Sequence, residues 1–387
     1  MNYLFKRKRD RYFLVLDIDT DSVNTLIYEK ENKKNIILAT YFEEFKKFGV
    51  FDSSLENFDT NIKKKAISNS INEVKKKVNR IPELSLVALP PDILRARILW
   101  QSYKRENQKK IINRREEEEI YNIVLKRAKR EVCRQYAERF GILPKELQFL
   151  NLEVLERKIN GYEVPSFLGF SGKCLDLKIL VSFGIKSSLK EFEDIFKSLK
   201  LGNIKILHLV QKLQNFIEGQ QDKDFVFLNI RRRLTQIFLT NKGKLVYVDE
   251  FKPGSNIFSF AVSQQWGLDA QRAEFLIQRY INSELSEEVR ERLKEKFYPL
   301  AQYWFTNLNK KLIEKKLLIK NIYLSGEGSL IPEIQEVLEK ENEEKDSLFI
   351  RPEIKIVYPK DLTDFEDKTS ELNNPKDVSL LLLCYHR

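Results

Sequence analysis

FLNIRRRLTQIFLTNKGKLVYVDEFKPGS, residues 227–255, is the stretch of this sequence that decides its fold. Three apolar runs in it are separated by an Arg-rich bend and by a tight turn at residues 241–244. Short apolar runs bounded by turn residues are typical of β-strands joined into hairpins. The segment is therefore expected to form strand, turn, strand, turn and strand.

The same pattern occurs near the start of the chain. Residues 12–28 indicate an apolar strand, a bend with the sequence DTDS and a second strand, and residues 36–45 continue the sheet. Apolar residues then recur at helical spacing over residues 61–78, which predicts an amphipathic helix. The later copy is followed by predicted helices over 265–280, 287–319 and 330–341, and by a strand over 321–324. The chain is therefore expected to contain two α/β cores.

Between the two cores the pattern changes to that of an α+β insertion. A short strand at 84–89 is followed by a charged helix from Glu116 to Phe140, which Gly141 ends. Strands are then expected at 147–159 and 174–183, and a helix at 188–199. The expected domains are a first core (1–83), an inserted subdomain (84–207), a second core (208–360) with a helical lobe at about 260–320, and a C-terminal return to the first core (361–387).

Composition excludes several classes of protein. The 387 residues include 68 Lys and Arg and 57 Asp and Glu, a net charge of +11, but both signs are interleaved, so no nucleic-acid partner is expected. Three scattered cysteines and two histidines argue against zinc sites, disulfides and Ser-His-Asp catalysis. No apolar run approaches the length of a membrane span, and residues 1–10 lack a leader's apolar core. A cytoplasmic protein is expected.

Two further segments have the character of phosphate-binding elements. LDIDTDSVN, residues 16–24, places hydroxyl groups of Thr20 and Ser22 at a bend beside Asp17, whose carboxylate suits Mg²⁺. YLSGEGSLIPEI, residues 323–334, is a glycine turn at the start of a helix, where an anion is stabilised. The plain alternatives are a capped hairpin turn and an ordinary strand-to-helix turn.

In this order the three segments resemble the actin-like ATPase superfamily, and within it the bacterial division protein FtsA and its relative PilM. LDIDTDSVN is similar to the first phosphate loop, DIGTxSVK, and NIRRRLTQIFLTNKGKLVYVDEFKPGS to DIGGGTTDIAIFxxGxLxYxxxIPxGG. GLDAQRAEFLIQRY, residues 267–280, resembles GxxxxxAExxKxxY, and YLSGEGSLIPEI resembles the adenosine motif LTGGGSxLPGI. The resemblance implies an α/β fold of the actin and Hsp70 type, which is a two-domain ATPase fold with an inserted α+β subdomain. Residues 159–182 resemble part of the inserted subdomain of FtsA.

The chain departs from the family pattern mostly in the second loop. Asn229 stands where the family has Asp, and Arg231 to Arg233 stand where it has glycines, while Asp19 replaces a glycine of the first loop. By resemblance, the nucleotide contacts of a retained site would be Asp17, Asp19, Thr20, Ser22, Asn229, Arg231, Arg233, Gly254, Glu274, Gly326, Gly328 and Ser329, with Mg²⁺ on Asp17. No catalytic residue is predicted. No nucleotide binding, binding of ATP without turnover, and true hydrolysis remain three alternatives.

The resemblance implies a scaffold protein rather than an enzyme. An FtsA-like protein self-associates and links FtsZ filaments to the inner face of the cell membrane during division. The alternatives are a PilM-like scaffold of type IV pilus assembly, whose inserted domain holds a pilus assembly protein, and an actin-fold kinase, against which the arginines argue. Peripheral membrane contact is expected at the N-terminus, through Tyr3, Leu4, Phe5, Lys6 and Arg7.

Overall fold

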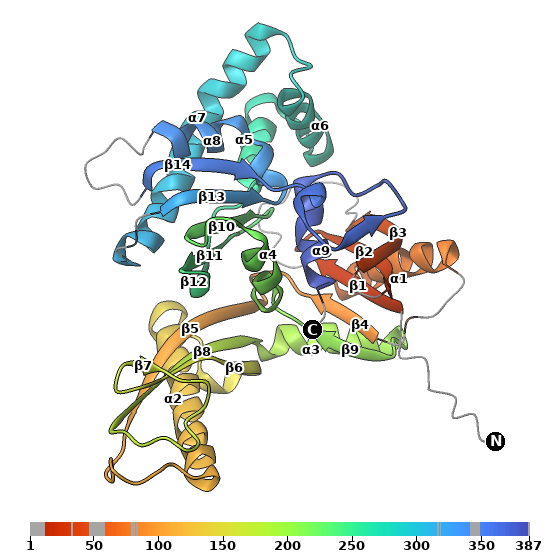
Figure 1. Ribbon diagram of the computed structural model, residues 1–387. Coiled ribbons are helices and arrows are strands. Elements are labelled where there is room, and N and C mark those ends of the chain that lie inside the picture. Colours follow the sequence, from red (N-terminus) through yellow and green to blue (C-terminus); the bar gives the residue numbers. More distant parts are fainter. Residues whose placement is uncertain are drawn as a thin grey trace, which may run out of the picture. The chain divides into compact units, whose positions relative to one another are not determined.

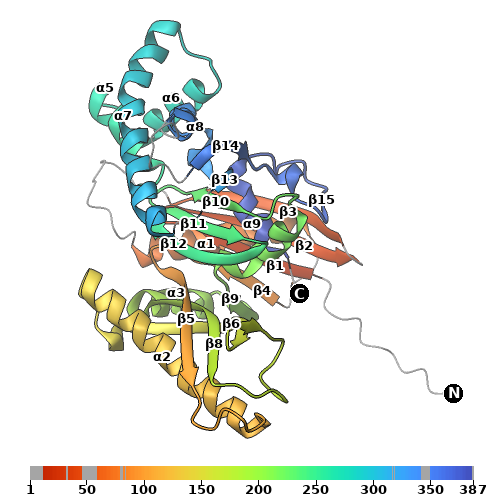
Figure 2. The same ribbon diagram turned by 60° about the vertical axis from the view of Figure 1, so that its left-hand side comes forward.

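The computed structural model describes residues 12–31, 34–45, 59–78, 82, 84–315, 317, 319–340 and 349–385. These residues divide into two compact units (Figures 1 and 2). Unit 1 comprises the described residues of Met1–Pro91 and Ile195–Arg387, and unit 2 is Asp92–Asp194. Each unit is considered by itself. Among the described helices, none is long and apolar enough to cross a membrane.

Unit 1 contains a six-stranded sheet in the order β15-β3-β2-β1-β4-β9. Strand β1 is almost entirely buried, and it pairs antiparallel with β2 and parallel with β4. Helix α1 packs against β2 and β3, and helix α9 packs against β1. The elements are β1 (Tyr12–Ile18), β2 (Ser22–Glu31), β3 (Lys34–Glu44), α1 (Thr60–Lys77), β4 (Leu84–Ala88), β9 (Asn203–Ile206), α4 (Leu213–Gly219), β15 (Phe365–Asp367) and α9 (Val378–Leu383).

A second sheet in unit 1 has five strands in the order β12-β11-β10-β13-β14. Its core joins the strands to helices α5 to α8, with the buried Trp304 of α7 donating from Nε1 to Thr235 Oγ1 at 2.8 Å. The elements are β10 (Phe225–Ile230), β11 (Thr235–Asn241), β12 (Lys244–Phe251), α5 (Asn256–Trp266), α6 (Ala270–Ile281), α7 (Glu287–Leu312), β13 (Ile319–Ser325), α8 (Pro332–Lys340) and β14 (Phe349–Ile356).

The two sheets of unit 1 repeat one topology. In each, an antiparallel meander of three strands has its first strand beside a parallel fourth strand: β3-β2-β1-β4 and β12-β11-β10-β13. The ends of β1 and β10 therefore occupy equivalent places, and each is followed by a tight bend. This duplication confirms the expected α/β class with two related cores.

Unit 2 is a four-stranded sheet, ordered β5-β8-β6-β7, with helix α2 on one face. Leu177, Ile179 and Val181 of β8 alternate inward to meet the buried stripe Val124, Ala128 and Val132 of α2. The elements are β5 (Leu94–Lys104), α2 (Arg114–Phe140), β6 (Leu147–Ile159), β7 (Tyr162–Glu163), β8 (Cys174–Ile185) and α3 (Lys186–Ser198), the last of which crosses the boundary between the units.

Two expected boundaries differ from the structure. The expected insertion, 84–207, includes β4 and β9, but β4 pairs with β1 and β9 pairs with β4, so both belong to the first sheet. The helix expected over 287–319 ends at Leu312, because Ile319 already pairs in β13 with Phe349 of β14. In both places a long-range strand pairing sets the limit, and local apolar spacing does not reveal it.

Candidate functional site

The bend between β1 and β2 is closed by its own polar groups. Asp19 accepts hydrogen bonds at Oδ1 from the backbone N–H of Thr20 (2.7 Å) and from the Thr20 hydroxyl (3.1 Å). The Asp19 N–H donates to the carbonyl of Ser22 at 2.8 Å. The hydroxyl and amide groups expected to cradle an anion here are therefore already bound to the protein itself, at Thr20 and Asp19.

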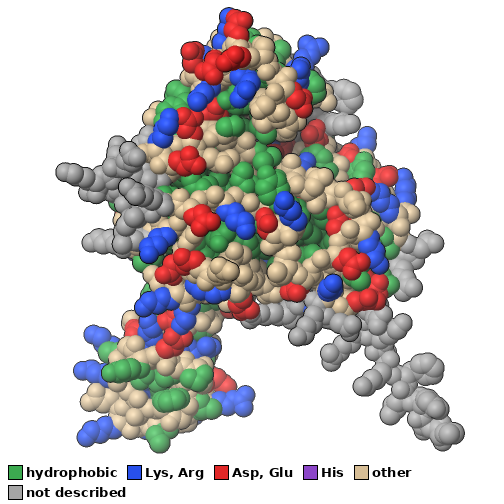
Figure 3. Space-filling model, turned by 45° about the horizontal axis from the view of Figure 1, so that its top comes forward, with side chains coloured by type: hydrophobic (Ala, Val, Ile, Leu, Met, Phe, Trp, Pro, Cys, Tyr) green, Lys and Arg blue, Asp and Glu red, His purple; other side chains and the backbone are tan. Residues whose placement is uncertain are grey.

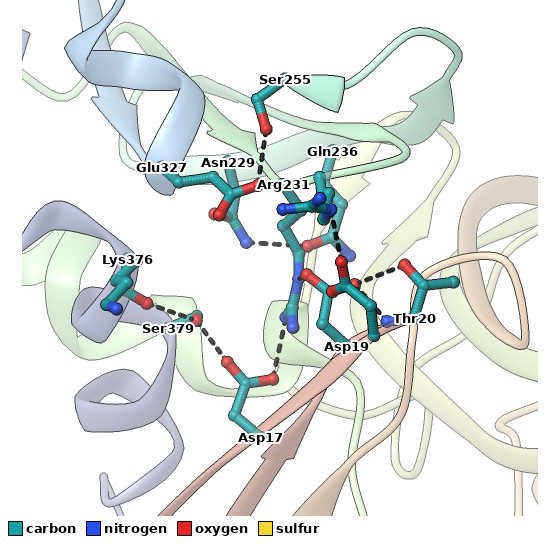
Figure 4. A network of polar contacts seen from close by, with 12 residues as sticks. Asp17, Asp19, Thr20, Asn229, Arg231, Gln236, Ser255, Glu327, Lys376 and Ser379 are labelled. Atoms are coloured by element: carbon teal, nitrogen blue, oxygen red, sulfur yellow. Dashed lines mark hydrogen bonds and ion pairs between the residues drawn. The ribbon is translucent and has the colours of Figure 1, made fainter. Parts of the chain in front are cut away.

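Arg231, in the bend after β10, joins this loop to the second sheet. Its Nη1 donates to Asp17 Oδ1 and its Nε donates to Asp19 Oδ2, both at 2.8 Å (Figure 4). The hydroxyl of Ser379, on α9, donates to Asp17 Oδ2. Both oxygens of Asp17 are thus engaged, and the three charged side chains are largely buried. Arg231 holds the position between the loops at which the resemblance places a phosphate.

The charges in this pair stabilise each other strongly. Burial alone would lower the pKa of Arg231, but the neighbouring carboxylates of Asp17 and Asp19 raise it above its ordinary value. Burial alone would likewise raise the pKa of Asp19, but the charge and hydrogen bonds of Arg231, with those of Thr20, lower it. Arg231 and Asp19 therefore stay ionised throughout the physiological range of pH.

Arg232 forms a second bridge beside the first. It contacts the carboxylates of Asp21, from the first loop, and of Glu274, on α6. Burial raises the pKa of Asp21 to about 7 against the opposing charge of Arg232, and Asp19, Glu327 and Glu274 raise it further. Burial also raises the pKa of Glu327, which accepts a hydrogen bond from the Ser255 hydroxyl at 2.6 Å. Glu274, expected among the nucleotide contacts, pairs with Arg232.

The glycines of the site pack against the protein's own backbone. A Cβ added to Gly254 would lie 2.2 Å from the carbonyl oxygen of Arg231. One added to Gly326, whose φ is +82°, would lie 2.4 Å from the carbonyl oxygen of Ile230, and one on Gly328 would lie 2.3 Å from Ile230 Cγ2. Glycine is required at these places so that the bends can approach each other. In a phosphate loop, glycines leave room for the ligand to approach the backbone. Here that room is occupied by Arg231 and Ile230 of the chain itself.

Asn229 lies opposite Ser325 in the parallel pair of β10 and β13. Its Nδ2 donates to Gln236 Oε1 at 3.0 Å, and its Oδ1 accepts a hydrogen bond from the Ser325 hydroxyl at 3.3 Å. A neutral amide holds Mg²⁺ less well than the carboxylate that the family has at this position. Over the described ranges, no group of three or more His, Cys, Asp or Glu side chains is arranged to hold a metal ion.

A cavity beside Asp17 and Arg231 has a volume of only about 10 Å³, which is room for roughly one water molecule. Its walls also include His208, Gln236 and Ser379. Pockets for small molecules and cofactors usually enclose several hundred Å³. The cavity is too small for a nucleotide, and both carboxylate oxygens of Asp17, the expected Mg²⁺ ligand, already accept hydrogen bonds. The residues present therefore do not fit Mg²⁺-ATP.

Most of the site residues expected from the sequence gather in one place, in unit 1. Asp17, Asp19, Thr20, Asn229 and Arg231 form the connected network of Figure 4. The remaining expected residues lie around it: Gly254, Gly326 and Gly328 as described, Glu274 of α6 paired with Arg232, Ser329 donating to the Gly326 carbonyl at 2.7 Å, Ser22 at the start of β2, and Arg233 in the bend after β10.

Sequence reasoning missed three residues around the two arginines. Asp21 pairs with Arg232, and the charge of Glu327 raises the pKa of Arg232. Ser379 donates to Asp17, the partner of Arg231. The signal for Asp21 is the charge match between the acidic sequence DIDTD and the triple arginine. Ser379 and Glu327 carry no local signal, because only the fold brings them near. The expected membrane residues Tyr3, Leu4, Phe5, Lys6 and Arg7 lie outside the described residues.

No protein-family model matches the sequence, and no curated protein does. Among solved structures, the chain is similar to one described as the PilM-PilN type IV pilus biogenesis complex, with a TM-score of 0.66, 16% identity and 96% of both chains covered. It is also similar to the ethanolamine utilization protein EutJ from Carboxydothermus hydrogenoformans, with a TM-score of 0.51, 9% identity, and 96% of this chain and 88% of that chain covered.

The chain has the fold of the actin-like ATPase superfamily, as the sequence predicts. Within that fold, the bends after β1 and β10 are joined to each other by arginine–carboxylate pairs. Of the two scaffold hypotheses, the comparison supports the PilM-like alternative better than the FtsA-like one.

Proposed function

We propose that this protein is a PilM-like scaffold of type IV pilus assembly that binds a pilus assembly protein. The observation that carries the proposal is the likeness to a PilM-PilN complex over 96% of both chains. At 16% identity this likeness concerns the fold, so the partner is inferred and has to be tested. On this proposal the protein acts at the inner face of the cell membrane, where its partner would be anchored.

We further propose that the scaffold works without nucleotide turnover. Phosphoryl transfer depends mainly on positioning and on metal charge. Here the guanidinium of Arg231 lies where the resemblance places a phosphate, and it donates to both Asp17 and Asp19. Asn229 stands where the family has Asp, and Gly326 is packed against backbone. An arginine between two carboxylates supplies permanently the attraction that a metal-bound phosphate would supply on binding.

The partner experiment compares two kinds of prey with the full chain as bait. One is the set of cytoplasmic segments of the pilus inner-membrane proteins from the same genome, and the other is FtsZ. We expect saturable binding to a pilus segment and none to FtsZ. Binding to FtsZ alone would replace the proposal with the division scaffold, and binding to neither would overturn both.

The nucleotide experiment titrates a fluorescent ATP analogue into the full chain, with and without Mg²⁺, and measures phosphate release. Since the cavity beside Asp17 holds about one water molecule, we expect no saturable binding. Tight binding that depends on Mg²⁺, together with phosphate release, would contradict this part of the proposal. Such a result would leave the proposal of a pilus assembly partner unaffected, because the partner experiment tests it separately.

A further inference from the structure

Two loops of unit 2 lie side by side at one end of its sheet. One connects β5 to α2 (residues 104–113), and the other runs through β7 to β8 (residues 160–173); together we call them the tip. The N–H of Ile112 donates to the carbonyl of Phe170 at 2.8 Å, and the N–H of Gly169 donates to the carbonyl of Ile112 at 3.0 Å. The backbones of the two loops are therefore fixed to each other.

The buried Arg105 and the half-buried Glu116 and Glu117 fix the two loops of the tip through hydrogen bonds and an ion pair. The Arg105 guanidinium donates to the carbonyls of Gly172 (3.0 Å) and Lys110 (2.9 Å), and it pairs with both oxygens of Glu116. Glu117 accepts hydrogen bonds from the backbone N–H of Phe167 and from the Ser166 hydroxyl, both at 2.9 Å. The tip is thus a built surface in which the loops have defined positions.

This surface exposes large apolar side chains. The exposed fractions are 63% for Ile111, 78% for Tyr162, 49% for Leu168 and 43% for Phe170. Contiguous exposed apolar groups with a polar rim mark interaction sites. In Figure 3, unit 2, the lobe at the lower left, shows apolar side chains among Lys and Arg side chains.

Exposed lysines accompany these apolar residues in the sequence. Lys109, Lys110 and Lys173 lie on the two loops, and Lys104 lies at the end of β5. Glu106 and Glu163 are the exposed carboxylates of the same loops, and Arg105 is neutralised by Glu116, so the exposed loop residues are net positive. Lysine stems can lie along apolar surface while the ammonium groups reach outward.

We propose that the tip of unit 2 binds an anionic lipid surface, with Ile111, Tyr162, Leu168 and Phe170 entering the interface between headgroups and acyl chains. Lysine is depleted at protein–protein interfaces, whereas it is attracted to anionic lipid. Three of the apolar side chains lie on the loops and Tyr162 lies on the two-residue strand β7, and all four are exposed to solvent. This proposal does not depend on the scaffold function. It places the membrane contact on the tip of unit 2, whereas the sequence predicts membrane contact at the N-terminus.

The test is cosedimentation of the full chain with vesicles of phosphatidylcholine, with and without phosphatidylglycerol. We expect binding only to the anionic vesicles, and weaker binding as salt is added. Leu168→Ser with Phe170→Ser should lower the partition coefficient roughly tenfold or more, because two apolar groups no longer enter the interface. Lys109→Gln with Lys110→Gln should lower it by about fivefold for each charge removed.

The matched control is Leu143→Ser with Phe275→Ser, which removes two apolar side chains of similar exposure (50% and 66%) outside the tip. It should bind as the unchanged chain does, and circular dichroism should show that every variant is folded. A chain lacking residues 1–11 should also retain binding. The proposal is overturned if the unchanged chain ignores anionic vesicles, which would leave a protein partner for the tip, or if only the deletion abolishes binding.

Discussion

Replacing Arg231 with methionine tests whether the bridge between the bends after β1 and β10 supports the fold of unit 1. The change leaves the carboxylates of Asp17 and Asp19 buried without their cation. Removing one partner of a buried ion pair typically costs about 3–5 kcal/mol. Asp17 keeps its hydrogen bond from Ser379, and Asp19 keeps those from Thr20, so we expect the lower end, about 3 kcal/mol.

The assay is urea unfolding followed by tryptophan fluorescence. Trp100 lies in unit 2, while Trp266 and the buried Trp304 lie in unit 1, so a Trp100→Phe background makes the signal report on unit 1. The matched control is Arg272→Met. Its side chain is 76% exposed and pairs with Asp269 at 3.5 Å, so its loss should cost under about 0.5 kcal/mol.

A second variant separates lost attraction from lost packing. When Asp17→Asn and Asp19→Asn are added to Arg231→Met, no unpaired charge remains, and at least half of the lost stability should return. Arg231→Met that unfolds at the same urea concentration as Arg272→Met would refute the reasoning. So would a triple variant that is less stable than Arg231→Met alone.

Two further predictions concern the same region. The pKa of Asp21 is raised to about 7 from 3.8, so its contribution to stability is present below about pH 4 and is lost as pH rises through 7. Asp21→Asn should therefore leave the unfolding free energy below about pH 4 unchanged and raise it near pH 8 by about 1–2 kcal/mol. This figure is discounted because the side chain is partly exposed. An equal change in unfolding free energy below pH 4 and near pH 8 would contradict the prediction. Gly326→Ala places a Cβ 2.4 Å from the Ile230 carbonyl and should lower the unfolding free energy by about 2–4 kcal/mol. Gly267→Ala, where φ is +62° and the space is open, should lose only about 1 kcal/mol, and equal losses would rule out the contact as the cause.

The elements of the fold followed from local pattern, and their limits did not. The apolar runs of 12–28 and 227–255 predict hairpins because each strand is short, buried and bounded by turn residues. The insertion boundary was missed because β4 and β9 have only five and four residues and belong to the first sheet through pairing with distant strands. Such pairing has no signature in the spacing of apolar residues.

Several residues of the predicted site lie together in unit 1, but the contacts between them are not visible in the sequence. Asp19 and Arg231 are 212 positions apart, and their pairing depends on the equivalent places of β1 and β10 in two similar sheets. The opposite charges of the two loops were visible in the sequence. What each charge meets was not, because an arginine after a strand is equally compatible with an exposed bend.

The arginine pairs change what the site does for unit 1. In a cleft whose two loops meet through a bound anion and metal, the connection exists only while the ligand is present. Here Arg231 connects the first loop to the second through two hydrogen bonds of 2.8 Å, and Arg232 adds contacts to Asp21 and Glu274. Because Arg231 and Asp19 both remain charged at physiological pH, the connection that they make persists without a ligand. A scaffold that keeps one shape is well served by such a site, whereas a nucleotide-driven switch would need a connection that can be broken.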